Sequence, residues 1–289
     1  MFPATPIPRV DTLSRERFVA DHKRPARPVV FEKLNRDWSA RAQWNIEYIK
    51  RVAGHRIVPL YDGGRATERK YQYAPAARMP LRDYLQLLDA GATDLRMFSF
   101  NLIAGAPELL ADFSYPDIGL RFFKRHPALF MAGKGARVQM HFDIDLADIL
   151  LCHFGGRKRV LLFSPDQTQY LYRVPFSFSS LHDIDYANPD FAKYPALQHA
   201  RAEVAELHHG DCLYIPRGYW HYVVYEETGL SLSLRALPST GVDMLKMLHN
   251  LLVIRSVEGV MRKLLGQRWN DRNERLAVAR THRHLPLTT

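Results

Sequence analysis

The sequence predicts a mainly β protein with flanking helices, in which one β-barrel or double-stranded sandwich carries helical segments at both ends. Three observations support this fold class. Residues 136–238 hold a series of short segments with strand composition, punctuated by Gly and Pro. The chain before residue 136 alternates between helical and extended patterns. From Ser239 onward the apolar residues recur at helical spacing.

The zone before residue 136 is expected to alternate helices with strands. In chain order we predict a helix at 14–22, a strand at 28–34, a helix at 39–53, a strand at 56–61, a helix at 81–88 and a strand at 97–103. The helix at 39–53 is predicted because Trp44, Ile49 and Val52 fall on one helical face. Gly91 is expected to end the helix at 81–88.

The central zone is expected to supply the barrel. Its predicted strands are 149–154, 157–163, 212–215, 219–225 and 230–237. Gly155 and Gly156 stand between the first two and indicate a tight hairpin. The polar and aromatic stretch 164–206 is long for a loop, so we expect it to be functional or to carry short helices of its own.

The carboxy-terminal zone is predicted to be helical. Val242, Leu245, Leu248 and Leu252 line one face of a first helix, and a basic helix follows at about 271–281. We therefore divide the chain into one domain at 1–238, with core strands at about 97–238, and a helical segment at 239–289. An apolar helix face needs a partner, so this segment is a candidate for homodimerisation.

The composition predicts a globular protein of the cytoplasm. Hydrophobic residues make up 47% of the chain, no apolar run could span a bilayer, and the amino terminus has no apolar leader segment. Cys152 and Cys212 lie far apart without a CxxC pattern, which argues against a disulfide scaffold or a zinc knuckle. The net charge of +10 is spread along the chain, which favours a solvated basic surface over a nucleic-acid partner while leaving the partner open.

Met140-His141-Phe142-Asp143 indicates a metal site. Side chains two apart on an extended backbone point the same way, so His141 and Asp143 should project together. His221 follows a strand and a Pro-Gly turn and is the candidate third ligand. Two His and one carboxylate leave open positions suited to non-haem iron(II) oxygenases, whereas zinc hydrolases more often use tetrahedral sites. His208 and His209 precede the Gly210-Asp211 turn and are expected to be loop residues.

Several motifs occur in the order found in a known family. They are His141-Phe-Asp143, the stretch 156–166, the stretch 188–195, Gly210-Asp-Cys-Leu-Tyr-Ile-Pro216 and Trp220-His221. Together they resemble the JmjC-type cupin-like hydroxylases, among them the asparaginyl hydroxylase of hypoxia-inducible factor and the tRNA hydroxylase of the wybutosine pathway. The resemblance is strong over residues 130–238 and weaker in the amino-terminal part.

The resemblance implies a double-stranded β-helix (cupin or jelly-roll) core and a dioxygenase that uses iron(II), dioxygen and 2-oxoglutarate to hydroxylate a carbon centre. It also implies a cation for the distal carboxylate of 2-oxoglutarate, which enters a partly desolvated pocket. Lys158 occupies the family's position for that anchor. Arg235 competes with it, because the wider oxygenase class often places an Arg shortly after the distal His.

Four further residues are expected near the cosubstrate. Asp148 and Val138 stand where relatives have Asn and Thr, Phe100 lies on a strand where a Tyr is often found, and Trp220 could shape the mouth of the pocket. The expected substrate is a protein or peptide side chain, then a tRNA base, then a small metabolite. A metal-binding cupin module without turnover remains the alternative from another functional class.

Overall fold

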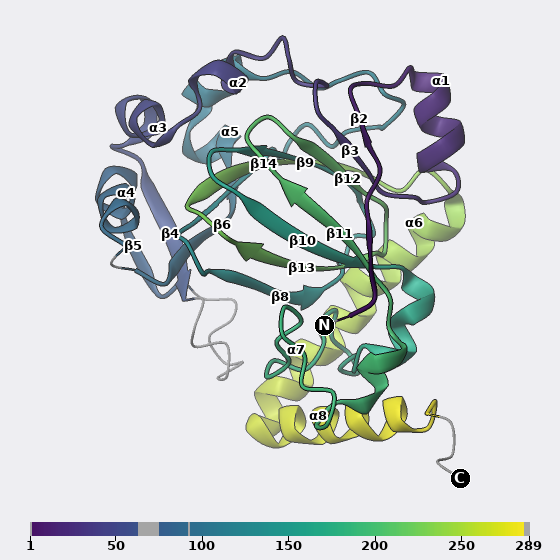
Figure 1. The fold of residues 1–289 in the computed structure, drawn as a ribbon. Coiled ribbons are helices and arrows are strands. Elements are labelled where there is room, and N and C mark those ends of the chain that lie inside the picture. The colour runs from purple at the N-terminus through teal and green to yellow at the C-terminus, as the bar shows by residue number, and fades with distance from the viewer. Residues whose placement is uncertain (1, 63–74, 92, 286–289) are drawn as a thin grey trace.

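The computed structural model describes residues 2–62, 75–91 and 93–285 and confirms the predicted fold class. Strands form two sheets that face each other, and helices surround them (Figure 1). The strands are β1 Ala4–Pro6, β2 Arg9–Val10, β3 Val29–Phe31, β4 Ile57–Asp62, β5 Ala77–Pro80, β6 Leu95–Asn101, β7 Ala128–Ala132, β8 Arg137–His141, β9 Asp148–Phe154, β10 Lys158–Phe163, β11 Ala202–Leu207, β12 Cys212–Ile215, β13 Trp220–Tyr225 and β14 Gly229–Ala236.

The helices flank these strands in the chain as they do in space. The α-helices are α1 Arg15–Phe18, α2 Ser39–Gln43, α3 Ile46–Ala53, α4 Leu81–Asp89, α5 Leu102–Gly105, α6 Gly241–Leu248, α7 Arg255–Leu265 and α8 Gln267–His282. The π-helical segments are η1 Val19–Lys23 and η6 His249–Ile254, and the 3-10 segments are η3 Pro107–Asp112, η4 Pro165–Tyr170 and η5 Pro195–His199. Among the described residues, no helix has the length and apolarity needed to cross a membrane.

The two sheets differ in size and share one core. The smaller sheet has the order β1-β11-β10-β13-β8, and the larger has the order β2-β3-β12-β9-β14-β7-β6-β4-β5. Side chains from both sheets pack in the space between them, including Val160 and Leu162 from β10 and Leu213 from β12. Because side chains alternate along each strand, the other residues of these strands point outward to a second layer of packing.

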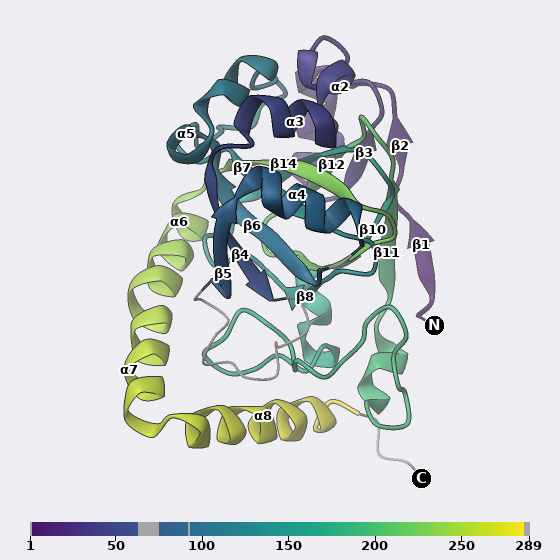
Figure 2. The same cartoon turned by 90° about the vertical axis from the view of Figure 1, so that its left-hand side faces the viewer.

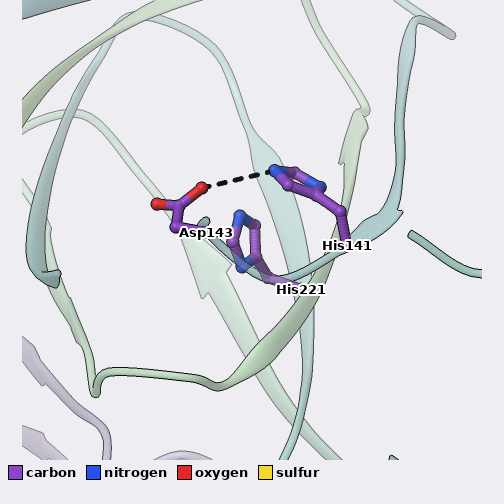
Figure 3. Close-up of side chains that lie close together, drawn as sticks. All are labelled: His141, Asp143 and His221. Carbon is purple, nitrogen blue, oxygen red and sulfur yellow. Dashed lines mark ion pairs between the residues drawn. The ribbon is translucent and has the colours of Figure 1, made fainter. Parts of the chain in front are cut away.

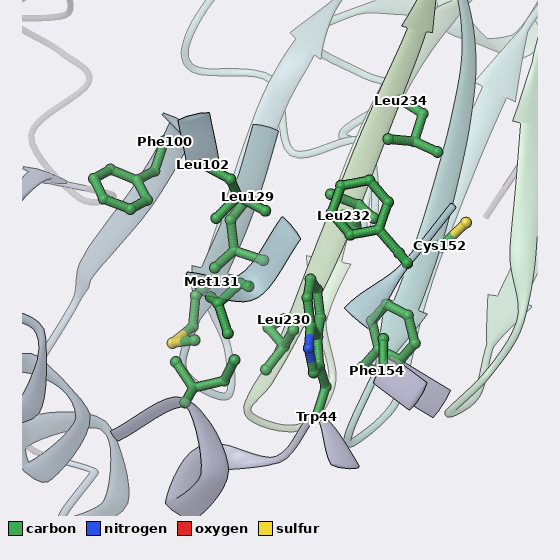
Figure 4. Close-up of a cluster of buried hydrophobic side chains, with 14 of the residues drawn as sticks. Trp44, Phe100, Leu102, Leu129, Met131, Cys152, Phe154, Leu230, Leu232 and Leu234 are labelled. Atoms are coloured by element: carbon green, nitrogen blue, oxygen red, sulfur yellow. The ribbon is translucent and has the colours of Figure 1, made fainter. Parts of the chain in front are cut away.

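Each sheet is covered on its outer face. Trp44, Leu129, Phe154 and Leu232 belong to the cluster that packs helices α2 to α5 against the larger sheet (Figure 4). Residues 164–200 and helix α8 cover the smaller sheet. The short helices predicted for the stretch 164–206 are present as η4 and η5, whereas its end forms β11, a strand that was not predicted. Both faces of the barrel strands are thus buried. The functional site described below also lies between the two sheets.

Local details of the sequence set several element boundaries. Gly155 and Gly156 both have positive φ, as the predicted hairpin between β9 and β10 requires. The single helix predicted at 39–53 is wrong in one respect, because it divides into α2 and α3. Trp44 has an extended backbone there, and Asn45 begins α3 by accepting a hydrogen bond from the Tyr48 amide at 2.9 Å.

The carboxy-terminal helices extend outside this barrel. Segments α6, η6 and α7 run on from one another along one side, and α8 turns back beneath the barrel (Figure 2). No residue from 241 to 265 is buried. We call residues 241–265 the arm.

Candidate metal centre

The two candidate histidines come from neighbouring strands of the smaller sheet. His141 ends β8 and lies directly opposite His221 on β13, and their ring centroids are 4.1 Å apart. Asp143 follows β8, and its Oδ1 is 3.7 Å from His141 Nε2. One ligand atom from each of the three side chains lies within 4.8 Å of the other two, and the three side chains converge in Figure 3. The structure therefore brings together the residues that the sequence predicted as ligands.

Backbone carbonyls fix which ring nitrogen of each histidine carries its proton. His141 Nδ1 is 2.7 Å from the Gln139 carbonyl oxygen, and His221 Nδ1 is 3.2 Å from that of Tyr219. A carbonyl oxygen can only accept a hydrogen bond, so Nδ1 must donate in both rings. Nε2 of each ring then keeps its lone pair for a metal ion.

The protonation states also suit metal binding. Burial, together with the neighbouring His221, lowers the pKa of His141 to about 3, and burial lowers the pKa of His221 as well. Burial alone would raise the pKa of Asp143, but Arg235 and the two histidines outweigh it and hold that pKa at about 2. At neutral pH the site consists of two neutral imidazoles and one carboxylate, which are the forms that bind metal.

Arg235 stands beside this carboxylate. Its Nη2 donates to Asp143 Oδ2 at 2.7 Å and to Asp145 Oδ1 at 2.6 Å, and its Nε donates to Asp145 Oδ2 at 3.0 Å. All three side chains are at most 23% exposed. Burial alone would lower the pKa of Arg235, but the two carboxylates raise it, so this guanidinium stays charged. Two carboxylates thus already share the charge of Arg235.

Lys158 lies in the same space between the sheets and has a different environment. It is 2% exposed, its Nζ donates to Ser231 Oγ at 2.5 Å, and the ammonium lies 4.0 Å from the centre of the Tyr225 ring. His153 Nδ1 is 3.0 Å from the same Ser231 Oγ. No carboxylate pairs with Lys158 among the described residues, and burial lowers the pKa of Lys158 to about 7. A buried cation without a counter-ion is suited to bind an anionic ligand.

Strand register explains how Lys158 and His221 come to share one space. Lys158 pairs with Tyr225 and Leu162 pairs with His221, and paired residues of an antiparallel ladder point to the same face. Val138, paired with Val223, packs in the core between the sheets and stays a candidate pocket residue.

The other three expected pocket residues do not line this space. Trp220 precedes His221 and therefore points to the outer face of the smaller sheet, where its Nε1 donates to Thr168 Oγ1 at 2.9 Å. Asp148 points to the outer side of the larger sheet and accepts a hydrogen bond from Tyr214 Oη at 2.8 Å. Both expectations are wrong because neighbouring strand residues alternate between faces.

Phe100 is also on the outer side, in the cluster of Figure 4. The register of β6 against β7 shifts between Met97 and Phe100, and Ser99 has a positive φ of 50°. This irregularity, which the sequence does not reveal, directs Phe100 away from the site. Phe98, two residues before Phe100 on the same strand, packs against Phe130, with 5.3 Å between the two ring centroids.

Sequence reasoning missed three residues of the site: Asp145, Ser231 and Tyr225. Asp145 continues the period-two pattern of His141 and Asp143, and Ser231 shares the face of Arg235 on β14. The alternation of side chains along each strand could therefore have identified both residues. Tyr225 could be found only from the register of β10 against β13.

Comparison with known families agrees with this geometry. The chain matches the family described as Cupin-like domain over residues 15–236. The protein belongs to the cupin-like JmjC family. The match ends at the close of β14, and the helices α6 to α8 follow it.

Relatives of this cupin-like JmjC protein carry several different names. It is 30% identical over 243 residues to "Lysine-specific demethylase 8" of Danio rerio, which covers 80% of this chain and 58% of that protein. It is 30% identical over 268 residues to "tRNA wybutosine-synthesizing protein 5" of Homo sapiens, and the alignment covers 82% of this chain and 80% of that protein. It is 28% identical over 240 residues to "Jumonji C domain-containing protein 5" of Drosophila melanogaster, and the alignment covers 78% of this chain and 59% of that protein. The chain thus spans little more than half of the first and third relatives.

Members of this family use iron(II) and 2-oxoglutarate as cofactors. The described residues fit both cofactors. His141, Asp143 and His221 present two nitrogens and one carboxylate from one side, the donor set typical of non-haem iron(II). Lys158 supplies a buried cation that lacks a protein counter-ion among the described residues.

Proposed function

We propose that this oxygenase hydroxylates a carbon centre, with iron(II) held by His141, Asp143 and His221 and the distal carboxylate of 2-oxoglutarate bound by Lys158. The observation that carries the proposal is the buried Lys158 ammonium, which faces the same space as His221 and lacks a carboxylate partner among the described residues. Bound iron(II) and 2-oxoglutarate would supply the activation of dioxygen. The residues around them orient the two cofactors.

Each residue has a distinct task in this proposal. The two imidazoles present Nε2, because their Nδ1 protons are engaged by backbone carbonyls. Asp143 offers Oδ1, because Oδ2 accepts the hydrogen bond from Arg235. Arg235 is then a support for Asp143, and we no longer expect it to anchor the cosubstrate.

We propose a protein or peptide side chain as the substrate. Two of the named relatives cited above are a demethylase and a tRNA-modifying protein, and removal of an N-methyl group also begins with hydroxylation of the methyl carbon. A tRNA base is the second candidate. It is favoured by the net charge of +10 and by the 80% of the human wybutosine protein that the alignment covers.

Two assays test the proposal. Purified protein with iron(II) in air should convert 2-oxoglutarate to succinate and carbon dioxide, and Lys158→Met should suppress the conversion at limiting 2-oxoglutarate. Mass spectrometry of proteins and tRNA from cells with and without the gene should then find one species that gains one oxygen or loses one methyl group when the gene is present. Absence of succinate formation by the wild-type protein would contradict the reaction.

We also propose that the protein forms a homodimer through the arm. The arm exposes large apolar side chains along its length: Val242, Leu245, Leu248, Leu252, Val253, Val257, Val260 and Leu264, with Leu265 at its end. At 1.5 Å per residue its 25 residues span about 38 Å, enough for an interface of about 800 Å² per partner.

The order of these side chains favours a second copy of the chain as the partner. Leu245 lies as far before the Leu252–Val253 bond as Val260 lies after it, and Leu248 and Val257 are related in the same way. In an antiparallel pair of identical helices, residues equidistant from the two-fold axis face each other. The central apolar residues of the arm would therefore contact one another in such a pair.

The thiols support the cytoplasm as the proposed compartment. Cys152 on β9 pairs directly with Cys212 on β12, and both are buried free thiols. Their contact was not predicted from the sequence, in which the two residues lie far apart. Thiols of cytosolic proteins are kept reduced, so disulfides are rare there.

A further inference from the structure

The turn that carries Asp143 holds an uncommon backbone conformation. The Leu146 amide donates to the Asp143 carbonyl oxygen at 3.0 Å, and Leu146 has a positive φ of 49°. Left-handed backbone is disfavoured for a residue with a branched side chain, so it persists where the surroundings hold it. The turn 143–146 contains a proposed metal ligand, so the contacts that hold it also set the position of that ligand.

One support comes from the barrel. Arg235 on β14 contacts Asp143 and Asp145, the first and third residues of the turn, through hydrogen bonds of 2.6 to 3.0 Å. These bonds hold the two acidic side chains. The carbonyl of Ile144 between them is left to another partner.

The second support comes from the arm. Asn250 Nδ2 donates to the Ile144 carbonyl oxygen at 3.1 Å. Asn250 lies in the π-helical segment η6, and single π-helical turns within α-helices occur frequently at functional sites. Within η6, Asn250 is half-buried toward the turn, whereas Leu252 and Val253 are exposed.

The arm is also tied to the chain that leads to His221. Arg217 Nε is 2.9 Å from Asp243 Oδ2 on α6, and both side chains are less than 30% exposed. Arg217 belongs to the Pro-Gly turn that opens β13. The arm therefore contacts both segments of chain that deliver proposed metal ligands, although no residue of the arm is itself buried.

We propose that the arm is a structural part of the metal centre, with Asn250 as the positioning residue that holds the Asp143 turn from outside the barrel. The proposal rests on the proposed metal ligands. If Asn250 is lost, the Ile144 carbonyl and the strained Leu146 backbone lose a support, and Asp143 is less well placed for the metal. Partners that orient metal ligands in this way commonly contribute tenfold or more to metal affinity.

The test is a calorimetric titration of the metal-free protein with Mn(II), which avoids oxidation during the measurement. We expect Asn250→Ala to raise the Kd for Mn(II) by about tenfold. His249→Ala is the matched control, because His249 is the exposed neighbour in the same π-helical segment, and it should change the Kd less than twofold. Asp243→Asn, which removes the ion pair with Arg217, should also raise the Kd, by a smaller factor.

Hydrogen exchange provides a second readout in the absence of metal. Amides of residues 141–147 should exchange faster in Asn250→Ala than in His249→Ala. An unchanged Kd together with unchanged exchange in Asn250→Ala would overturn the role of the arm. Failure of the wild-type protein and of His249→Ala to bind Mn(II) would instead overturn the assignment of the metal ligands.

Discussion

Arg235 and Asp143 form an ion pair, with 2.7 Å between Nη2 and Oδ2. Because Asp145 also engages Arg235 at 2.6 Å, the guanidinium is shared by two carboxylates before any cosubstrate enters. A third carboxylate would have to compete with both. Lys158 has no such competitor among the described residues, and this contrast separates the two candidate anchors.

Cosubstrate affinity should therefore depend on Lys158 far more than on Arg235. We expect Lys158→Met to weaken 2-oxoglutarate binding by about a hundredfold, since removing one member of a buried charge pair costs about 2–5 kcal/mol. Arg235→Lys should change that Kd by less than about fivefold and should weaken Mn(II) binding instead. Calorimetry measures the Kd for Mn(II) on the metal-free protein and the Kd for 2-oxoglutarate on the Mn(II)-loaded protein. The reverse ranking would identify Arg235 as the anchor.

Cosubstrate binding should weaken at alkaline pH. Burial lowers the pKa of Lys158 to about 7, and a bound carboxylate would raise it. Below pH 7 the lysine is already protonated, so the Kd for 2-oxoglutarate should be flat there. Above pH 7 binding must take up a proton, so the Kd should rise by up to tenfold per pH unit. Titrations from pH 6 to 9 test this, and Lys158→Arg should remove the slope.

The same lysine should destabilise the protein when the cosubstrate is absent. The pKa of Lys158 is about 7 in the folded state against 10.5 for an ordinary lysine. The unfolded chain thus binds more protons between these values, and the contribution of Lys158 to stability rises with pH across that window and is at its lowest below pH 7. Lys158→Met should raise the free energy of unfolding by about 2–4 kcal/mol at pH 6 and by less at pH 9.5.

Urea denaturation of the metal-free protein at these two pH values measures the difference. Lys134→Met is the control for loss of a lysine, because Lys134 is exposed. Equal effects of Lys158→Met at both pH values would mean that Lys158 is not neutralised by burial.

The arm should mediate self-association. Leu252→Glu combined with Val253→Glu places charges at the centre of the proposed two-fold contact and should convert a dimer into a monomer. Sedimentation velocity of the metal-free protein measures the change. Arg275→Glu on α8, which also changes an exposed residue, should leave the dimer intact. A monomeric wild-type protein would contradict the proposed dimer.

Strand alternation explains both what the sequence could predict and what it could not. It correctly grouped His141 with Asp143 and separated Lys158 from its basic neighbours, because these patterns lie within one strand. It was not applied to Trp220, expected at the pocket mouth as an aromatic residue, or to Asp148, placed there by similarity of position, although each stands next to an inward-facing residue. Within a single strand, odd-numbered and even-numbered residues point to opposite faces, so the sequence alone could have placed these two side chains outside the pocket.

Features that depend on pairing between distant strands were beyond the sequence. The contact of Cys152 with Cys212 follows from the register of β9 against β12, and the outward turn of Phe100 follows from an irregularity in β6. The partners of Arg235 could not be predicted either. Its position after His221 suggested a cosubstrate anchor, and only the fold shows Asp143 and Asp145 beside it.

The most direct test of the metal and cosubstrate assignments is an anaerobic titration of the purified protein with iron(II) and 2-oxoglutarate, followed by visible absorption. Chelation of iron(II) by 2-oxoglutarate at a site of this kind gives a weak charge-transfer band. We predict that the wild-type protein develops the band, that His141→Ala does not, and that Lys158→Met needs much more 2-oxoglutarate to reach it. A wild-type protein without the band, or a His141→Ala variant that retains it in full, would contradict the account.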